Sequence, residues 1–441
     1  MTSSVAWLVL LLLVGAASSR RIGVNFRFGD KPTVNRVIEH DEADIAGRVL
    51  SVKLDGSSTT RKGQLAYMIC DDSKRERKCR VIVEDYRHGN RTISKSCELV
   101  LTPEQSKRST ISDKFDVTVV RDDFVVVTWY EQKVNKGKGT SLLRLTKLQL
   151  NDCRSKPIDT KKVEHLEAIT YGLLSMDGQN VYWYGVGVNP QRPRVYFSFG
   201  VEFDKDELAV NGSRRWMSLE KFGRDSPRLE VRFEPVIKTL FFYPIPFGFT
   251  LLERVPDQRN SSLVTDRIFS TVNPGNEVKA PYATMEHPAD HGITFNSDQS
   301  YSTLCNSTRY TVNCSLDFTL SPFLNALLSP LLWKTTLDYP GPEDEVQAIR
   351  DLAVYNTEYG PLLALGHQDD YTLLLWRPVM KPQVYTARLP RPNCDEFNVV
   401  ESGLFENENG DYCVQTLCRA GVAGQKFTVS VACIDYKLDY I

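Results

Sequence analysis

Hydrophobic and polar residues alternate along much of this chain with the period of a β-strand. Ser141–Leu150 (SLLRLTKLQL) alternates apolar and polar side chains, and Phe124–Glu131 (FVVVTWYE) is β-branched or aromatic almost throughout. A Lys-Gly-Lys-Gly turn separates these two segments, so together they predict a β-hairpin. Six further pairs of segments have the same character: Leu65–Cys70 with Cys79–Val83, Val181–Val188 with Arg194–Phe203, Phe249–Val255 with Ser262–Phe269, Tyr301–Cys305 with Arg309–Leu316, Tyr371–Arg377 with Gln383–Leu389, and Tyr412–Cys418 with Lys426–Cys433.

The seven predicted hairpins recur along the chain. Their first strands open 41 to 70 residues apart, and several open with an aspartate before an aromatic residue, as in Asp370-Tyr371 and Asp411-Tyr412. This repeat predicts an all-β fold, a β-propeller-like array of about seven four-stranded blades in a single domain of residues 21–441. The short last step predicts that an N-terminal strand such as Arg48–Leu54 completes the final blade. Two or more β-sandwiches are the alternative, because their hairpins also recur closely.

Helical patterns are confined to one stretch of the sequence. In Ser321–Leu332, Ser321 is suited to an N-cap and Pro322 to the first helical position, and Glu343–Leu352 is an acidic helical candidate. Both segments lie between the fifth and sixth hairpins. We therefore expect a small helical insertion near residues 317–360.

The first residues and the cysteines indicate an oxidising compartment. Residues 1–20 combine an apolar run, Ala6 to Gly15, with small residues after it, which predicts a secretory signal peptide. An even number of cysteines in a secreted chain predicts disulfides, and the chain has no CxxC motif. Cys70/Cys79 and Cys305/Cys314 flank predicted hairpin turns, whereas the last four cysteines form a local group. The ten cysteines are Cys70, Cys79, Cys97, Cys153, Cys305, Cys314, Cys394, Cys413, Cys418 and Cys433.

Five N-x-S/T sequons predict N-glycosylation, and each is expected in a surface loop. Two of them lie between Cys305 and Cys314, where crowding and rapid disulfide formation favour leaving Asn313 unmodified. The acceptors are Asn90, Asn211, Asn260, Asn306 and Asn313.

Charge is distributed unevenly. Residues 21–165 contain 29 Lys and Arg against 21 Asp and Glu, whereas residues 166–441 contain 24 against 34. The densest basic segment is Ser73–Arg80 at the tip of the first hairpin, which is either a solvated turn or a site for anionic glycans. The candidate patch comprises Lys74, Arg75, Arg77, Lys78 and Arg80.

The sequence contains little that suggests catalysis. It lacks a GxSxG elbow, a GxGxxG motif and a P-loop. His287 and His291 could pair as metal ligands on a helix, but Pro288 and Gly292 favour a polar loop. His367-Gln368-Asp369-Asp370 could offer carboxylates to a cation, although capping of a turn is the simpler interpretation.

Taken together, the sequence predicts a secreted, disulfide-bonded glycoprotein that acts as an extracellular binding module. We expect its partner to be an extracellular protein or a sulfated glycan, not a nucleic acid, and we expect no membrane span. No catalytic residue and no cofactor is predicted. The alternative is an extracellular propeller hydrolase or lyase with an axial divalent cation such as calcium, whose ligands come from separate blades.

Overall fold

A computed structural model shows an all-β molecule, and the residues that it describes contain no helix. The described residues are the strands given below and the segments 29–32, 102, 150–154, 257, 259–260, 262, 310, 348–350, 358–359, 367–369, 391–395, 407, 409–411 and 435. The predicted signal peptide, residues 1–20, and the whole of the predicted helix Ser321–Leu332 lie outside them.

Seven antiparallel sheets follow one another along the chain, and we number them in that order. In pairing order, sheet 1 consists of β3 (Arg48–Leu54), β4 (Gln64–Asp71), β5 (Lys78–Asp85) and β6 (Lys95–Leu101), and sheet 2 consists of β7 (Ser109–Arg121), β8 (Phe124–Asn135), β9 (Lys138–Gln149) and β10 (Ser155–Pro157). Sheet 3 consists of β11 (Ile169–Met176), β12 (Asn180–Asn189), β13 (Arg192–Asp204) and β14 (Val210–Ser218). Sheet 4 consists of β15 (Glu230–Phe233), β16 (Val236–Ile245), β17 (Gly248–Pro256), β18 (Leu263–Thr271) and β19 (Ala283–Pro288).

The remaining strands form sheets 5 to 7 and a separate two-stranded ribbon. Sheet 5 consists of β20 (Gly292–Ser297), β21 (Ser302–Ser307), β22 (Thr311–Asp317) and β23 (Trp333–Asp338), and sheet 6 consists of β24 (Asp351–Thr357), β25 (Gly360–Gly366), β26 (Asp370–Arg377) and β27 (Gln383–Pro390). Sheet 7 consists of β28 (Val399–Glu406), β29 (Tyr412–Arg419), β30 (Phe427–Ile434) and β2 (Thr33–His40). The terminal ribbon consists of β1 (Val24–Phe28) and β31 (Tyr436–Tyr440). All seven predicted hairpins are confirmed as pairs of neighbouring strands.

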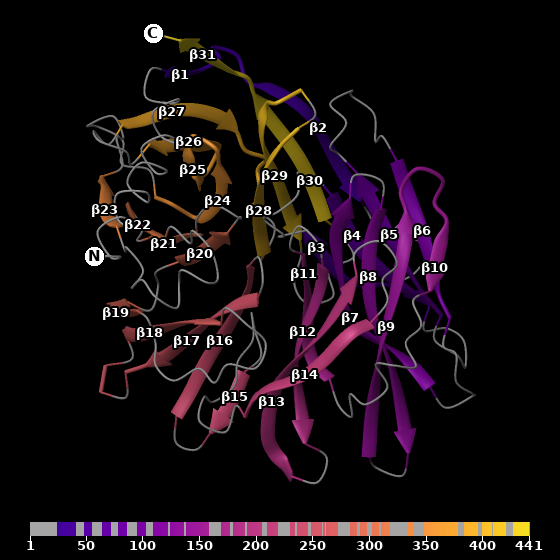
Figure 1. The fold of residues 1–441 in the computed structure, drawn as a ribbon. Helices are drawn as coiled ribbons and strands as arrows, with labels where there is room; N and C mark the ends of the chain where they lie inside the picture. Colours follow the sequence, from indigo (N-terminus) through magenta and orange to yellow (C-terminus); the bar gives the residue numbers. More distant parts are fainter. Residues whose placement is uncertain are drawn as a thin grey trace, which may run out of the picture.

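The sheets are arranged around a common centre (Figure 1). One early strand of each sheet contacts its counterpart in the next sheet, in the series β3, β7, β11, β16, β20, β24, β28 and back to β3. This series of contacts returns to its starting strand. Each sheet therefore has neighbours on both sides, as the blades of a propeller do.

Burial follows from this stacking. Every residue of β25 (GPLLALG) and of β30 (FTVSVACI) is buried, because a middle strand is covered on both faces of its sheet. Leu65, Tyr67 and Ile69 of sheet 1 pack with Leu417 and Phe427 of sheet 7, so the first and last sheets share one apolar cluster.

The two ends of the chain are joined twice. β2 adds an N-terminal strand to the outer edge of sheet 7 by pairing with β30, and β1 pairs with β31 in the terminal ribbon. The expectation that an N-terminal strand completes the last sheet is confirmed, but Arg48–Leu54 was the wrong strand. That segment is β3, the first strand of sheet 1, because it pairs with the next strand along the chain.

The predicted helical insertion near residues 317–360 is corrected where the structure describes it, because those residues are in strands or irregular. Trp333–Asp338 is β23, which completes sheet 5, and Asp351–Thr357 is β24, which begins sheet 6. Within Glu343–Leu352 the described residues 348–350 are irregular and Asp351 is already in a strand. Pairing with β25 outweighs the local helical pattern at Asp351 and Leu352.

Five disulfides join all ten cysteines, and no cysteine is free. Cys70–Cys79 and Cys305–Cys314 bridge directly opposite residues of hairpins, as their spacing predicted. The last four cysteines are paired locally, Cys394 with Cys418 and Cys413 with Cys433. The fifth bridge joins Cys97 on β6 to Cys153 after β9, so it links sheets 1 and 2.

Candidate functional site

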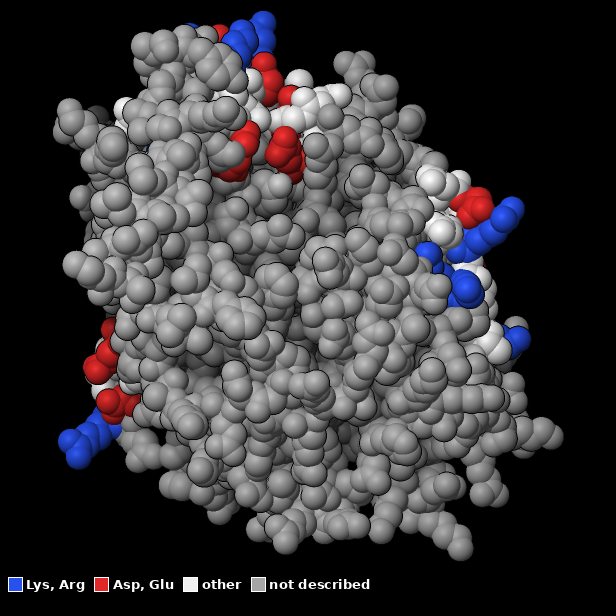
Figure 2. Space-filling view, viewed as in Figure 1, with Lys and Arg blue, Asp and Glu red and all other residues white. Residues whose placement is uncertain are grey.

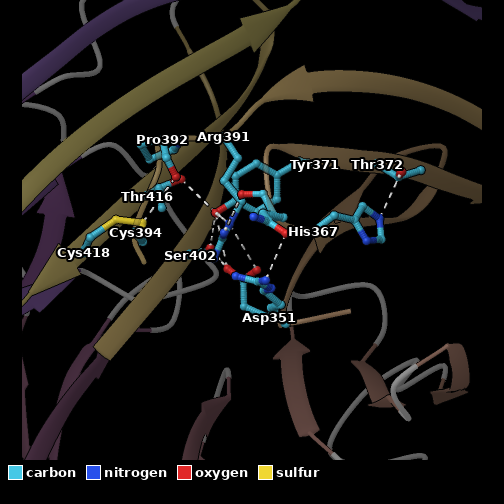
Figure 3. A network of polar contacts seen from close by, with 12 residues as sticks. Asp351, His367, Tyr371, Thr372, Arg391, Pro392, Cys394, Ser402, Thr416 and Cys418 are labelled. Atoms are coloured by element: carbon cyan, nitrogen blue, oxygen red, sulfur yellow. Dashed lines mark hydrogen bonds and ion pairs between the residues drawn. A yellow bond between two sulfur atoms is a disulfide. The ribbon is translucent and has the colours of Figure 1, made fainter. Parts of the chain in front are cut away.

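The most elaborate polar cluster in the described part of the chain lies between sheets 6 and 7 (Figure 3). Two rows of residues face each other there. In sheet 6, Asp351, Gly366 and Tyr371 are aligned across β24, β25 and β26. In sheet 7, Ser402 and Thr416 are aligned across β28 and β29. Each row follows from the register of its sheet, so the two sheets bring together residues that are far apart in sequence.

The Tyr371 hydroxyl lies at the centre of the cluster. It is 2.7 Å from Ser402 Oγ and 2.9 Å from Thr416 Oγ1, and it donates to Asp351 Oδ2 at 3.3 Å. Ser402 Oγ also donates a short hydrogen bond to the Asp351 carboxylate. The tyrosine is completely buried, and burial raises the pKa of its hydroxyl. Tyr371 is therefore a neutral hydrogen-bonding group that joins the two sheets.

Arg391, which follows β27, supplies the positive charge of the cluster. Its Nε is 3.7 Å from Asp351 Oδ1 and donates to the Tyr371 hydroxyl at 3.3 Å, and its guanidinium carbon lies 5.6 Å from the centre of the Tyr371 ring. Nη1 donates to the Gln368 carbonyl at 3.2 Å. Side-chain exposure is 2% for Arg391 and 11% for Asp351, so the opposite charges compensate each other with little help from solvent.

Gly366 provides the space in which this cluster forms. Because it lies between Asp351 and Tyr371 in the aligned row, a Cβ added there would overlap the Asp351 carboxylate and would lie 2.9 Å from Tyr371 Cε1. A residue without a side chain is therefore required at this position for the tyrosine to reach the aspartate.

The turn at His367–Asp370, suggested above as a cation site, is held by hydrogen bonds and an ion pair to neighbouring residues. The backbone N–H of His367 donates to the Asp370 carbonyl at 2.8 Å, and Asp370 forms an ion pair with Arg388. The His367 ring is buried, with Nδ1 3.3 Å from the Ala348 carbonyl and Nε2 3.3 Å from Thr372 Oγ1. Burial lowers the pKa of the ring. These contacts favour the interpretation of the segment as a turn.

Among the described residues, no group of three or more His, Cys, Asp or Glu side chains is placed to hold a metal ion. His287 is on strand β19 opposite Val264, rather than in the predicted loop, whereas His291 lies outside the described residues. An axial calcium ion stays a prediction.

The predicted basic patch is described only in part. Lys74, Arg75 and Arg77 lie outside the described residues, Lys78 is exposed at the start of β5, and Arg80 is half-buried and forms an ion pair with Glu98 at 3.4 Å. Of its two described members, therefore, Lys78 is presented to solvent and Arg80 has an anionic partner.

The sequons occupy varied positions. Asn260 is exposed in a turn whose backbone N–H groups are bound by Asp257, which agrees with the expected loop. Asn211, Asn306 and Asn313 lie on β14, β21 and β22, so the expectation of a loop is wrong for these three. Asn313 is exposed and stands directly opposite Asn306. Asn90 lies outside the described residues.

Sequence reasoning missed the cluster of sheets 6 and 7 almost entirely. It singled out Asp370-Tyr371 as the opening of a strand, but gave no role to Asp351, Arg391 or Ser402. A buried ion pair in sheet 2 was also missed: Arg144 Nη2 is 2.7 Å from Glu131 Oε2. The available signal for that pair was one charge of each sign inside two apolar strands that form a predicted hairpin.

No protein-family model and no curated protein matches the chain. Solved structures that resemble it include the β-propeller domain of the Trilobed protease from Pyrococcus furiosus, with 11% identity, a TM-score of 0.37, and coverage of 90% of this chain and 97% of that one. The Cps50 (Swd1) β-propeller domain of Myceliophteria thermophila has 9% identity, a TM-score of 0.36, and coverage of 89% and 99%.

A Pyrococcus horikoshii acylaminoacyl peptidase has 10% identity, a TM-score of 0.37 and coverage of 86% of this chain. This chain spans about half of that enzyme, 51%. At such TM-scores these likenesses do not bear on activity. No described helix is long and apolar enough to cross a membrane.

Proposed function

We propose that this chain is a secreted binding module, built as a propeller of seven blades, that binds sulfated glycans through basic side chains on the outer parts of sheets 1 and 2. The blade count is supported by the seven sheets and by the strand contacts that return to β3. The pairing of β2 with β30 supports closure, because it joins the first part of the chain to the last sheet. Five disulfides suit an extracellular environment.

The charges of sheets 1 and 2 favour an anionic partner. The described acidic side chains that reach the surface there are Glu98 and Asp152, and each is bound by an arginine, Arg80 or Arg154. Further lysines are exposed or half-exposed in the same two sheets, namely Lys78, Lys147 and Lys156. Figure 2 shows blue side chains gathered along the right-hand edge of the molecule, with less red beside them.

The observation that carries this proposal is the pairing of Lys147 with Lys156. These residues are directly opposite each other on β9 and β10, so both side chains project from the same face of sheet 2. Arg154, whose side chain is 84% exposed, lies two residues before Lys156. Neighbouring cations on a rigid sheet create a local positive potential that attracts sulfate groups.

Retention on a heparin column tests the proposal. The triple variant Lys147→Glu, Arg154→Glu and Lys156→Glu is compared with a control that makes the same change of charge at Lys31, Arg259 and Lys437, which are exposed outside sheets 1 and 2. We expect wild type and control to elute at similar salt concentrations and the first variant to elute much earlier, because salt screens the contacts between exposed charges.

Equal losses in the two variants would show that net charge, not this site, governs retention. Absence of any wild-type retention would reject the glycan as the partner. Elemental analysis of the same preparation tests the alternative, since an axial enzyme site requires stoichiometric calcium.

A further inference from the structure

Three tyrosines form a connected chain where the terminal ribbon meets sheets 6 and 7. Tyr359 lies in the turn between β24 and β25, Tyr412 begins β29, and Tyr436 begins β31. The hydroxyl of Tyr436 is hydrogen-bonded to those of both Tyr359 and Tyr412. The three phenols therefore connect three separate elements, including the C-terminal strand.

The rings of Tyr412 and Tyr436 are suitably placed for coupling. Their centroids are 4.8 Å apart and their planes differ by 11°. Because the ortho carbons flank the hydroxyl of a phenol, two hydrogen-bonded hydroxyls bring the coupling positions of the rings close together. The ring of Tyr359 is 5.9 Å from that of Tyr436, at an interplanar angle of 68°.

The chain runs from the surface into the protein. Tyr359 and Tyr436 are half-buried, whereas Tyr412 is 1% exposed. Phe26 of β1 packs on this group, 5.1 Å from the ring of Tyr436 and 5.9 Å from that of Tyr359. An oxidant can therefore reach the outer phenols, while the inner ring is held in place by packing.

A carboxylate lies at the outer end of the chain. The Tyr359 hydroxyl donates to Glu358, and burial raises the pKa of all three tyrosines, so each phenol is protonated in neutral solution. Oxidation of a protonated phenol removes a proton with the electron. Glu358 is positioned to accept the proton released by Tyr359.

We propose that Tyr412 and Tyr436 are a site of oxidative cross-linking, at which a peroxidase-type oxidant forms dityrosine within one molecule. Each phenol loses one electron and one proton, and the two phenoxyl radicals join through a new bond between their ortho carbons. Loss of the two ortho hydrogens as the rings regain aromaticity returns both phenolic O–H groups. Hydrogen peroxide accepts the two electrons and two protons in total and becomes two molecules of water.

This bond would fix the C-terminal strand β31 to sheet 7. The contact between β1 and β31 consists of five residue pairs in a two-stranded ribbon, which is a marginal structure by itself. A covalent bond at Tyr436 would hold the strand on which β1 pairs. The proposal does not depend on glycan binding.

Treatment of the mature protein with hydrogen peroxide and a haem peroxidase tests the proposal. After reduction, alkylation and digestion, mass spectrometry should find the Tyr412 peptide joined to the Tyr436 peptide in protein that runs as a monomer. Tyr436→Phe, which keeps the ring, should reduce this product to the level of untreated protein, and Tyr359→Phe should slow its formation.

Tyr385→Phe is the matched control. This tyrosine is half-buried in the same aromatic group, 5.5 Å from Phe26, but its hydroxyl donates to Gln383. The Tyr385→Phe variant should leave the yield of the cross-link between Tyr412 and Tyr436 unchanged. The proposal would be overturned if the wild type were oxidised without a bond between Tyr412 and Tyr436, for example with cross-links only between molecules at exposed Tyr310. An equal yield from the Tyr436→Phe protein would also overturn it.

Discussion

Two buried ion pairs in this molecule are built in different ways. Glu131 and Arg144 belong to neighbouring strands of one hairpin, and Nε and Nη2 of the arginine both donate to the same carboxylate oxygen, at 3.1 and 2.7 Å. Asp351 and Arg391 come from opposite edges of sheet 6 and form an ion pair at 3.7 Å, and both also contact the Tyr371 hydroxyl, which is hydrogen-bonded to Ser402 of the next sheet. The first pair completes a hairpin, whereas the second joins two sheets.

This difference shows where a propeller-like fold needs polar groups. Apolar contacts hold neighbouring sheets together over most of their faces, but they specify position weakly because they have no direction. Hydrogen bonds that join the Tyr371 hydroxyl with those of Ser402 and Thr416 require one alignment of sheet 6 with sheet 7. Removal of Asp351 and removal of Glu131 should therefore lower the stability by similar amounts. The structural effect of the first should reach both sheets, whereas that of the second should stay within one hairpin.

The largest effect is expected for Asp351→Ala, which leaves Arg391 buried without its anionic partner. Loss of one partner of a buried pair costs about 3–5 kcal/mol. We expect a loss of this size in the free energy of unfolding measured in urea. Glu131→Ala should cost a similar amount, because Arg144 is also buried.

Hydrogen exchange separates the two variants. Asp351→Ala should increase exchange in both β24 and β28, whereas Glu131→Ala should increase it within β8 and β9. Replacement of both Asp351 and Arg391 by apolar residues should recover part of the lost stability, since no uncompensated charge remains. If the increase in hydrogen exchange caused by Asp351→Ala were confined to sheet 6, the cluster would not couple sheets 6 and 7.

A smaller loss is expected for Gly366→Ala, which changes the space in the cluster but no charge. The added methyl group overlaps the Asp351 carboxylate and must displace it from Tyr371. Overpacking of this kind costs about 1–3 kcal/mol. Gly403→Ala is the matched control on the neighbouring sheet, because nothing lies within 4 Å of its added Cβ. Equal stability of the two variants would reject the role assigned to Gly366.

The hairpins and two disulfides could be predicted because their causes are local in sequence. Alternation and a turn determine the pair β8 and β9, and a spacing of nine residues places Cys70 opposite Cys79. The cluster of sheets 6 and 7 could not be predicted, because Asp351 and Ser402 are 51 residues apart and meet only through the register of two sheets.

The choice of strand at the closure also depends on tertiary pairing. Residues 33–40 and Arg48–Leu54 both precede the first predicted hairpin, and the second has the clearer strand pattern. Arg48–Leu54 pairs with β4, to which a short connection leads, and this leaves β2 for the edge of sheet 7. Likewise, β23 and β24 are strands because their neighbours pair with them, although the surrounding sequence has helical features.

The smallest effect is expected from His367, whose contribution depends on pH. Burial is the largest cause that lowers the pKa of its ring below the ordinary value of 6.5. Arg388 acts in the same direction, against the hydrogen bond to the Ala348 carbonyl and the charges of Asp370 and Asp351. The unfolded chain therefore binds a proton before the folded protein does as the pH falls. The stabilisation is complete above pH 6.5 and is lost as the pH falls through the lower pKa of the folded state.

We expect the free energy of unfolding of wild type to decrease more steeply below pH 6.5 than that of His367→Gln, while titration of the carboxylates affects both proteins alike. Parallel pH curves would show that the ring titrates equally in both states, and that its burial beside Thr372 does not oppose the charge.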